Sequence, residues 1–310
     1  MSEPAPANHG AKSRYAVLSV VSNSCLIALK LVAGLATGSV AILSEAAHSF
    51  LDLLASFLTL IAVRFSAHPP DADHPFGHGK VENVSALFEA LLIIAGGLYI
   101  VKEAVEGLVG GRELPSLSLG LAVMLFSSIV NHVVSKVLFS VGKKTGSPAL
   151  VADAWHLKTD VMTSFGIFLA LLVISLGKLV EPGLDLDFVD SVAALVVSFF
   201  IIKTGWTLAS EAVSNLIDHS LSPAELKLIE EHIAGFAPAV KGYRRLRSRR
   251  SGPFQIVAVD LLVDASLSVG EAHGLGVKVA EAVREHYPRA DVTFHLEPVP
   301  SDGSPPPAGV

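Results

Sequence analysis

Six long stretches of mainly apolar residues fill the first two thirds of the chain. Each is close to the roughly 20 helical residues that cross a bilayer core about 30 Å thick, so we expect six membrane-spanning helices. These stretches are residues 15–36, 40–65, 81–109, 117–141, 148–179 and 188–209. The first is too long for a signal peptide and has no small-residue cleavage pattern, so we expect the mature protein to keep it.

The chain after Asp218 alternates shorter helical and strand patterns. The expected helices are residues 223–236 and 269–287, and the expected strands are 240–249, 255–263 and 291–296. We therefore predict a membrane all-α domain of six helices followed by a small α+β domain. The expected division is a cytoplasmic N-terminal segment at 1–14, the six-span domain at 15–218, the α+β domain at 219–300, and a disordered tail rich in Pro, Gly and Ser at 301–310.

The composition agrees with a membrane protein. Hydrophobic residues make up 51% of the 310 positions and charged residues 17%, whereas about a quarter of a soluble domain is charged. The net charge of −6 gives no electrostatic basis for nucleic-acid binding. Cys25 is the single cysteine, which excludes an internal disulfide.

Basic residues in the short loops set the direction of the spans. One side of the predicted membrane carries Lys12, Arg14, Arg64, Lys80, Lys143 and Lys144, and the other carries Arg112 and Lys178. This asymmetry predicts that both termini lie in the cytoplasm.

Two of the predicted spans carry ionisable residues in the same pattern. The second contains "SEAAHSFLD" and the fifth contains "ADAWHLKTD", so both read acid-x-x-His-x-x-x-Asp. Residues four apart share one helical face, so each span can offer an imidazole and a carboxylate to a common point. The four side chains His48, Asp52, His156 and Asp160 match the tetrahedral preference of Zn²⁺ for nitrogen and oxygen ligands.

A single His-x-x-x-Asp is more often a hydrogen-bonded pair between helices than a metal site. Two copies in two spans favour metal, because packing could use Ser or Asn at lower desolvation cost. Glu45 and Asp153 precede the two histidines by three residues on nearly the same face. We leave two roles open for these acids: staging ions on either side of the four-ligand site, or orienting the histidines.

The loop after the second span, "DADHPFGHGKVE", offers a second ligand set. Its spacing allows one metal to be held by Asp71, His74 and His78. A phosphate-binding loop is excluded, because Val81 rather than Ser or Thr follows Lys80 and no strand precedes the motif.

Together with the six spans, the motifs "GSVAILSEAAHSFLD", "HPFGHGKVE" and "ADAWHLKTD" make the chain resemble the cation diffusion facilitator family, of the bacterial ferrous-iron and zinc efflux type. The resemblance implies a homodimer that exports a divalent metal from the cytoplasm in exchange for protons, in a bacterial inner membrane. It implies that the two His-Asp pairs form the transport site and that the site prefers zinc, with cadmium or cobalt as further substrates. It also implies that the loop residues form a second site at the cytoplasmic mouth.

The same resemblance implies a metallochaperone-like, ferredoxin-like fold for the terminal domain, where metal bridges two protomers and acts as a regulatory ligand. The matching positions are Asp260, His273, His295 and Glu297. Because Arg244 and Asp260 stand where relatives often have histidine, we expect one site rather than a two-metal cluster. Lys80 and Asp218 match an ion pair that joins the two domains in relatives and acts as a hinge.

The sequence bears on three functions other than zinc efflux. Iron or manganese efflux by the same mechanism stays open, because geometry alone does not fix the metal. An intramembrane metalloenzyme lacks a His-Glu-x-x-His motif. A membrane-anchored metal sensor has no reason to bury four ligands between spans. We expect no cofactor other than the transported metal.

Overall fold

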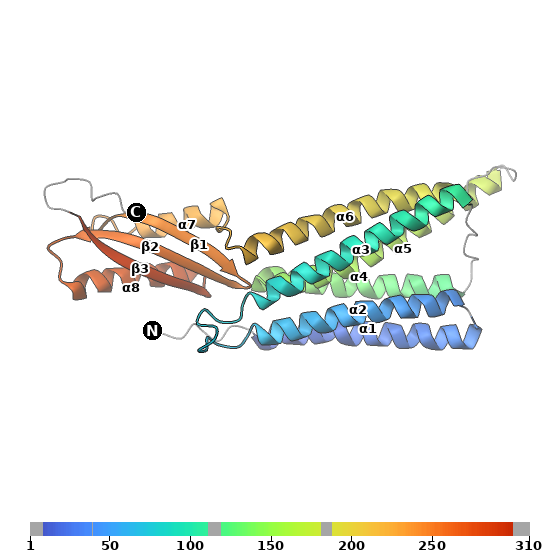
Figure 1. Ribbon diagram of the computed structural model, residues 1–310, viewed down its shortest axis with the longest axis horizontal. Coiled ribbons are helices and arrows are strands. Elements are labelled where there is room, and N and C mark those ends of the chain that lie inside the picture. The colour runs from blue at the N-terminus through green and yellow to red at the C-terminus, as the bar shows by residue number, and fades with distance from the viewer. Residues whose placement is uncertain (1–8, 39, 111–118, 181–187, 300–310) are drawn as a thin grey trace. The chain divides into compact units, whose positions relative to one another are not determined.

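A computed structural model describes residues 9–38, 40–110, 119–180 and 188–299. Six long helices occupy its N-terminal part and run side by side (Figure 1). They are α1 (His9–Thr37), α2 (Val40–Phe65), α3 (Val81–Gly110), α4 (Leu119–Thr145), α5 (Pro148–Val180) and α6 (Phe188–Leu216). All six are long and apolar enough to cross a membrane, which confirms the predicted fold class for this part of the chain.

The first helix begins earlier than the apolar pattern indicated. We expected a span from Tyr15, but α1 already begins at His9 and includes Lys12, whose side chain is fully buried. The rest of the predicted N-terminal segment, residues 1–8, and the predicted tail at 301–310 lie outside the described residues.

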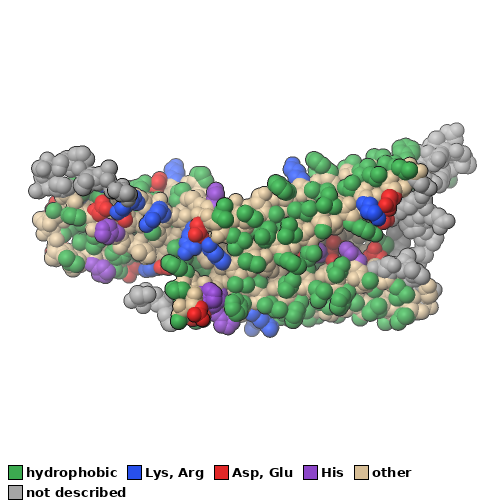
Figure 2. Space-filling model, viewed as in Figure 1, with side chains coloured by type: hydrophobic (Ala, Val, Ile, Leu, Met, Phe, Trp, Pro, Cys, Tyr) green, Lys and Arg blue, Asp and Glu red, His purple; other side chains and the backbone are tan. Residues whose placement is uncertain are grey.

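The helical part is apolar on the outside and partly polar within. On the face shown in Figure 2, hydrophobic side chains cover the lateral surface of the helices, as a surface in contact with lipid requires. Polar and charged side chains are buried between the helices instead, among them Asn23, Asp52 and Glu89. Intramembrane ionisable groups of this kind face the bundle interior and mark functional positions.

Small residues allow the helices to approach closely where α6 crosses α3. A Cβ atom on Gly97 would lie 2.6 Å from Ile202 Cγ1, and one on Gly205 would lie 2.7 Å from Ile94 Cγ1. Packing through small residues is the usual way in which membrane helices associate, because lipid leaves no hydrophobic driving force between them.

The C-terminal part is the small α+β domain that we expected. It contains α7 (Pro223–Ala234), β1 (Val240–Ser251), β2 (Phe254–Asp264), α8 (Val269–His286) and β3 (Ala290–Val299). The sheet order is β1-β2-β3, with β1 antiparallel and β3 parallel to β2. Both helices begin at a serine with a capping box, Ser222 with Glu225 and Ser268 with Glu271.

Both helices of this domain share one hydrophobic core with the sheet. Alternate residues of β2 and β3, including Val257, Val259, Leu261 and Val292, pack against Ile229 of α7 and other apolar residues of α7 and α8. The intervening strand residues therefore face the side of the sheet opposite the helices. By its contacts the chain forms two compact units, which divide between Val213 and Ser214.

Candidate metal centre

Three of the four predicted transport-site ligands come together between α2 and α5. Asp52, His156 and Asp160 each offer a ligand atom, and these atoms all lie within 4.8 Å of one another. His156 Nε2 lies 3.1 Å from Asp52 Oδ1. Asp52 and His156 are buried, at 7% and 8% exposure, and Asp160 is half-buried. Two carboxylates and an imidazole at this spacing can hold a divalent metal ion.

His48, the fourth predicted ligand, is not part of this group in the described structure. It lies one helical turn before Asp52 on α2, and its side chain is exposed. Residues four apart share a helical face, so His48 borders the group without joining it.

Amide and hydroxyl side chains from α1, α2 and α4 surround the group. Asn131 Nδ2 lies 3.5 Å from Asp160 Oδ2, and Asn23 donates to the main-chain oxygen of Asp52 at 3.5 Å and to Ser56 Oγ at 2.8 Å. Sequence reasoning missed these residues, because uncharged polar side chains in a span carry no pattern that distinguishes them from packing positions.

Glu45 and Asp153 contact groups other than the histidines. Glu45 pairs with Lys30 of α1 at 3.2 Å. Asp153 is fully buried and accepts a hydrogen bond from Ser56 Oγ at 3.1 Å, while its Oδ2 atom has no hydrogen-bond partner in the described part of the chain. The staging and orienting roles for these two acids stay predictions.

A further buried acid, Glu89 of α3, was not predicted. Its side chain is 1% exposed, Thr59 Oγ1 donates to its Oε1 at 3.1 Å, and its Oε2 lies 3.7 Å from His156 Nδ1. The signal that could have found it is the general one: an ionisable residue inside a span is functional by default. Glu89 lies outside the two repeated motifs, so no local pattern distinguishes it.

The loop between α2 and α3 brings its three predicted ligands together. Asp71, His74 and His78 have ligand atoms within 4.8 Å of one another. His78 Nε2 lies 3.3 Å from Asp71 Oδ2, and the two histidine rings are 4.5 Å apart between centroids. The backbone N–H of His74, with help from nearby His78, lowers the pKa of Asp71 below its ordinary value and favours the ionised form that a metal requires.

The four predicted ligands of the terminal domain lie on two sides of its sheet. Asp260 and His295 are paired positions on β2 and β3, and both face away from the helices, as does Glu297 two residues farther along β3. His273 lies on α8 and its ring contacts Phe294, whose side chain packs against the helical face. One protomer therefore places three of the four on one face of its sheet, although among the described residues their ligand atoms do not all lie within 4.8 Å of one another.

Arg245 forms ion pairs with both carboxylates of this set. It pairs with Asp260 and, at 2.9 Å, with Glu297. Arg245 has a backbone φ of +44° and lies within the register shift between Arg244 and Arg247, where β1 departs from regular pairing with β2. A metal bound here would have to displace this guanidinium.

The predicted hinge residues lie in different units. Within the C-terminal unit, Asp218 accepts from Arg249 Nη1 at 3.0 Å. A pairing with Lys80 would join the two units and stays a prediction.

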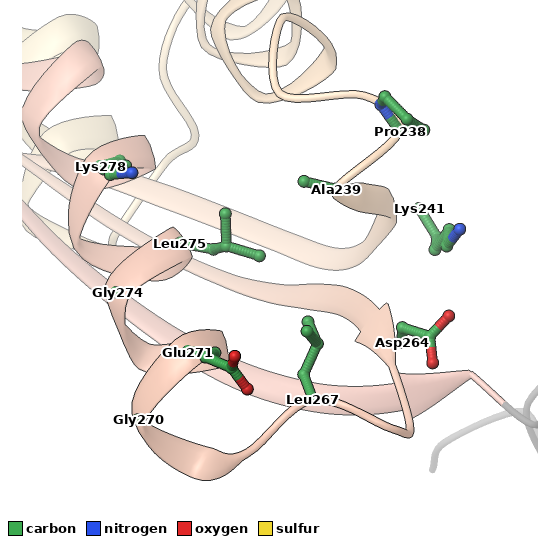
Figure 3. Close-up of a pocket in the computed structure, with 10 residues that line it drawn as sticks. All are labelled: Pro238, Ala239, Lys241, Asp264, Leu267, Gly270, Glu271, Gly274, Leu275 and Lys278. Atoms are coloured by element: carbon green, nitrogen blue, oxygen red, sulfur yellow. The ribbon is translucent and has the colours of Figure 1, made fainter.

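A cavity of about 540 Å³ in the terminal domain is lined by residues other than the predicted ligands (Figure 3). It is bordered by the start of β1, the end of β2 and the first half of α8. Two lysines, Lys241 and Lys278, and two acids, Asp264 and Glu271, line it together with apolar side chains. The balanced charges favour no class of ligand.

Two family models cover nearly the whole chain. Residues 16–217 match the cation efflux transmembrane domain, and residues 221–299 match the cytoplasmic domain of cation efflux proteins. The chain belongs to the cation diffusion facilitator family. It is therefore an integral, multi-pass membrane transporter and not an enzyme, as the sequence motifs predicted.

Relatives within the family align over almost their full length. The uncharacterized transporter sll1263 of Synechocystis sp. is 34% identical over 285 residues, which cover 92% of this chain and 90% of the relative. The cation-efflux pump FieF of Salmonella newport is 30% identical over 294 residues, which cover 94% and 95%.

Two solved structures match about a quarter of the chain. The structure of CzrB in its zinc form is 30% identical and covers 26% of this chain and 92% of that chain, with a TM-score of 0.24. The metal-bound C-terminal domain of CzcD from Thermotoga maritima is 31% identical and covers 25% and 94%, with a TM-score of 0.23.

Proposed function

We propose that this cation diffusion facilitator exports Zn²⁺ from the cytoplasm in exchange for protons, by alternating access in a homodimer. The observation that carries the proposal is the group of Asp52, His156 and Asp160 between two spans, in which Asp52 and His156 are buried. Its donors are one imidazole and two carboxylates, which suit Zn²⁺ better than the all-oxygen shells of Mg²⁺ or Ca²⁺. Cadmium and cobalt are further substrates on the same grounds.

His48 completes the site as the fourth ligand. It lies one turn from Asp52 on α2 and is exposed beside the group. A change in its side-chain rotamer, or a small rotation of α2, brings its imidazole to the other three ligands. A ligand that joins and leaves in this way would let the site bind the ion in one state and release it in another.

Proton exchange follows from the chemistry of the ligands. Histidine binds metal as the neutral imidazole and aspartate as the carboxylate, so metal and protons compete for the same atoms. Metal arriving from the cytoplasm displaces protons, and protons arriving from a more acidic outer compartment displace metal.

The remaining ligand groups have supporting roles. Asp71, His74 and His78 form a second metal site at the cytoplasmic mouth, with both termini in the cytoplasm of a bacterial inner membrane. The set of Asp260, His273, His295 and Glu297 binds regulatory metal between protomers and reports a high internal concentration. Because Arg245 pairs with two of these acids, we expect this site to be weak.

Zinc uptake into inside-out vesicles with an imposed pH gradient tests the transport proposal. We expect uptake that depends on an acidic interior and is lost in Asp52→Ala and Asp160→Ala, with both variants folded by size-exclusion chromatography. A panel of Zn²⁺, Cd²⁺, Co²⁺, Fe²⁺ and Mn²⁺ gives the substrate order. Full uptake in both variants, or uptake of iron or manganese in preference to zinc, would contradict the proposal.

A further inference from the structure

Each nitrogen of the His156 ring faces a different carboxylate. Nε2 lies 3.1 Å from Asp52 Oδ1, on the side of the proposed transport site. Nδ1 lies 3.7 Å from Glu89 Oε2, on the side of α3. Three helices thus meet at this imidazole, although the repeated sequence motifs involve only two of them.

The two atoms on the α3 side face each other at a distance too long for a hydrogen bond. His156 Nδ1 and Glu89 Oε2 are both buried, and neither has a hydrogen-bond partner in the described part of the chain. A shortening of about 0.5 Å would bring them within the usual N–H···O range. Buried polar atoms left unpaired in this way call for a specific explanation.

Packing alone does not account for a glutamate at this position. Burying a carboxylate is costly unless it is paired, and Glu89 is only 1% exposed. Its one described hydrogen bond comes from Thr59 and satisfies Oε1 alone. A glutamine would accept the same hydrogen bond without the cost of burying a charge.

We propose that Glu89 positions His156 for the transported metal, by accepting a hydrogen bond from its Nδ1–H and thereby presenting Nε2 to the ion. The inference rests on the proposed transport site and adds a third helix to it. A neutral imidazole ligates metal through one nitrogen and carries its proton on the other, and the hydrogen bond at the second nitrogen decides which is which. A carboxylate in that place also fixes the ring and raises its basicity.

Thr59 holds the glutamate in the required direction. Its hydroxyl donates to Glu89 Oε1 and leaves Oε2 turned toward His156. Ser85 Oγ lies 3.4 Å from the same hydroxyl and extends the chain of contacts back to α3. The positioning device therefore consists of Thr59 and Glu89, with His156 as the residue on which they act.

Zinc transport by the full-length protein in vesicles tests this role. We expect Glu89→Leu to raise the KM for zinc about 10- to 100-fold, the usual effect of removing such a partner, while kcat per folded protein changes far less. Glu89→Gln should have a smaller effect, because its amide oxygen still accepts from Nδ1–H. Thr59→Val should shift KM in the same direction. Glu106→Leu is the matched control on α3, where the acid is 60% exposed and pairs with Lys102.

Nitrogen NMR of the zinc-bound protein with labelled histidine gives a second readout that a merely structural role would not move. We expect His156 to carry its proton on Nδ1 and to bind zinc through Nε2, and expect Glu89→Leu to lose this single tautomer. A KM for Glu89→Leu within about twofold of the parent would overturn the inference, since the expected loss is at least tenfold. So would zinc bound through Nδ1. If Glu89→Leu does not fold, Glu89→Gln and Thr59→Val carry the test.

A different result is expected if the proposed transport site itself is wrong. Parent protein and Asp160→Ala would then bind and transport zinc equally, whatever the residue at position 89. Loss of transport in Asp160→Ala together with an unchanged KM in the Glu89 variants would leave the proposed function intact and reject only the positioning role.

Discussion

The ion pair between Lys12 and Glu82 should be essential to the stability of the helical domain. Both side chains are 0% exposed, and Lys12 Nζ lies 2.8 Å from Glu82 Oε1. Ser66 also donates to Oε1, at 2.6 Å, and Ser147 donates to Oε2. The carboxylate thus connects α1, the end of α2, the start of α3 and the start of α5.

Replacing one partner leaves a buried charge without its counter-ion. Lys12→Met keeps the apolar stem but removes the ammonium, and breaking a buried pair in this way costs about 3 to 5 kcal/mol. For a domain of this size that corresponds to a fall in melting temperature of about 6 to 20 °C. The double variant Lys12→Met/Glu82→Gln removes both charges and keeps an oxygen for the two serines. It should recover most of the loss, because replacing a whole buried pair is often nearly neutral.

The parent, Lys12→Met, Glu82→Gln and the double variant form a double-mutant cycle. Their thermal unfolding in detergent, followed by tryptophan fluorescence, measures the coupling between Lys12 and Glu82. Lys102→Met, in an exposed pair with Glu106, is the matched control and should have little effect. A Lys12→Met variant within about 2 °C of the parent would refute the reasoning, since this is less than about 1 kcal/mol. A double variant no more stable than Lys12→Met would refute it as well.

Three further predictions concern other parts of the chain. Although partial burial opposes ionisation, hydrogen bonds from Ser222 and the Arg250 guanidinium hold the pKa of Glu225 below its ordinary value of 4.5. Ionised Glu225 should therefore contribute about 0.5 to 1 kcal/mol to the free energy of unfolding above pH 4.5, and this contribution should vanish as the pH falls through the lowered pKa. The difference in melting temperature between parent and Glu225→Gln should accordingly close in acid. Gly205→Ala should destabilise the protein by about 1 to 3 kcal/mol in chemical unfolding, because the added Cβ would meet Ile94 and the Ala90 carbonyl oxygen. Gly96→Ala is the control, since a Cβ there meets nothing within 4 Å, and an effect of Gly205→Ala no larger than that of the control would contradict the prediction. Asp71→Asn should lower the zinc stoichiometry in calorimetry by one ion per protomer while transport-site binding persists, and an unchanged stoichiometry would reject the loop site.

Hydropathy alone predicted most of the helical domain. The second span was expected at 40–65 and α2 occupies those residues, while α3 ends one residue beyond the expected range of 81–109. Long apolar runs bounded by loops carry this information without reference to the fold. The strand at 291–296 was placed well but extends from Ala290 to Val299, because pairing with β2 continues past the part that alternates clearly.

The buried charges could not be predicted in the same way. Lys12 counted as a loop cation in the sequence, yet its side chain is fully buried against Glu82, 70 positions later. Glu89 shows no local pattern, since its partners Thr59 and His156 lie on two other helices. Such groups are defined by tertiary packing, and only their presence inside an apolar run signals that a partner must exist.

The predicted metal-ligand sets show the same difference between local sequence patterns and tertiary packing. Asp71, His74 and His78 lie in one short loop, where spacing nearly fixes proximity, and the structure brings them together. The terminal-domain set depends on which face of the sheet each strand presents and on where α8 packs. Resemblance to a family could not show that His273 lies on the opposite side from His295, nor that Arg245 pairs with Asp260.

X-ray anomalous scattering at the zinc edge, from the zinc-loaded protein, tests the central claim most directly. We predict a peak between α2 and α5 within bonding distance of Asp52, His156 and Asp160, with His48 turned in as the fourth ligand. The peak should be absent in Asp160→Ala while any peak at the loop remains. Zinc found only at the loop or in the terminal domain, with the buried group between the spans lacking a peak, would contradict the account.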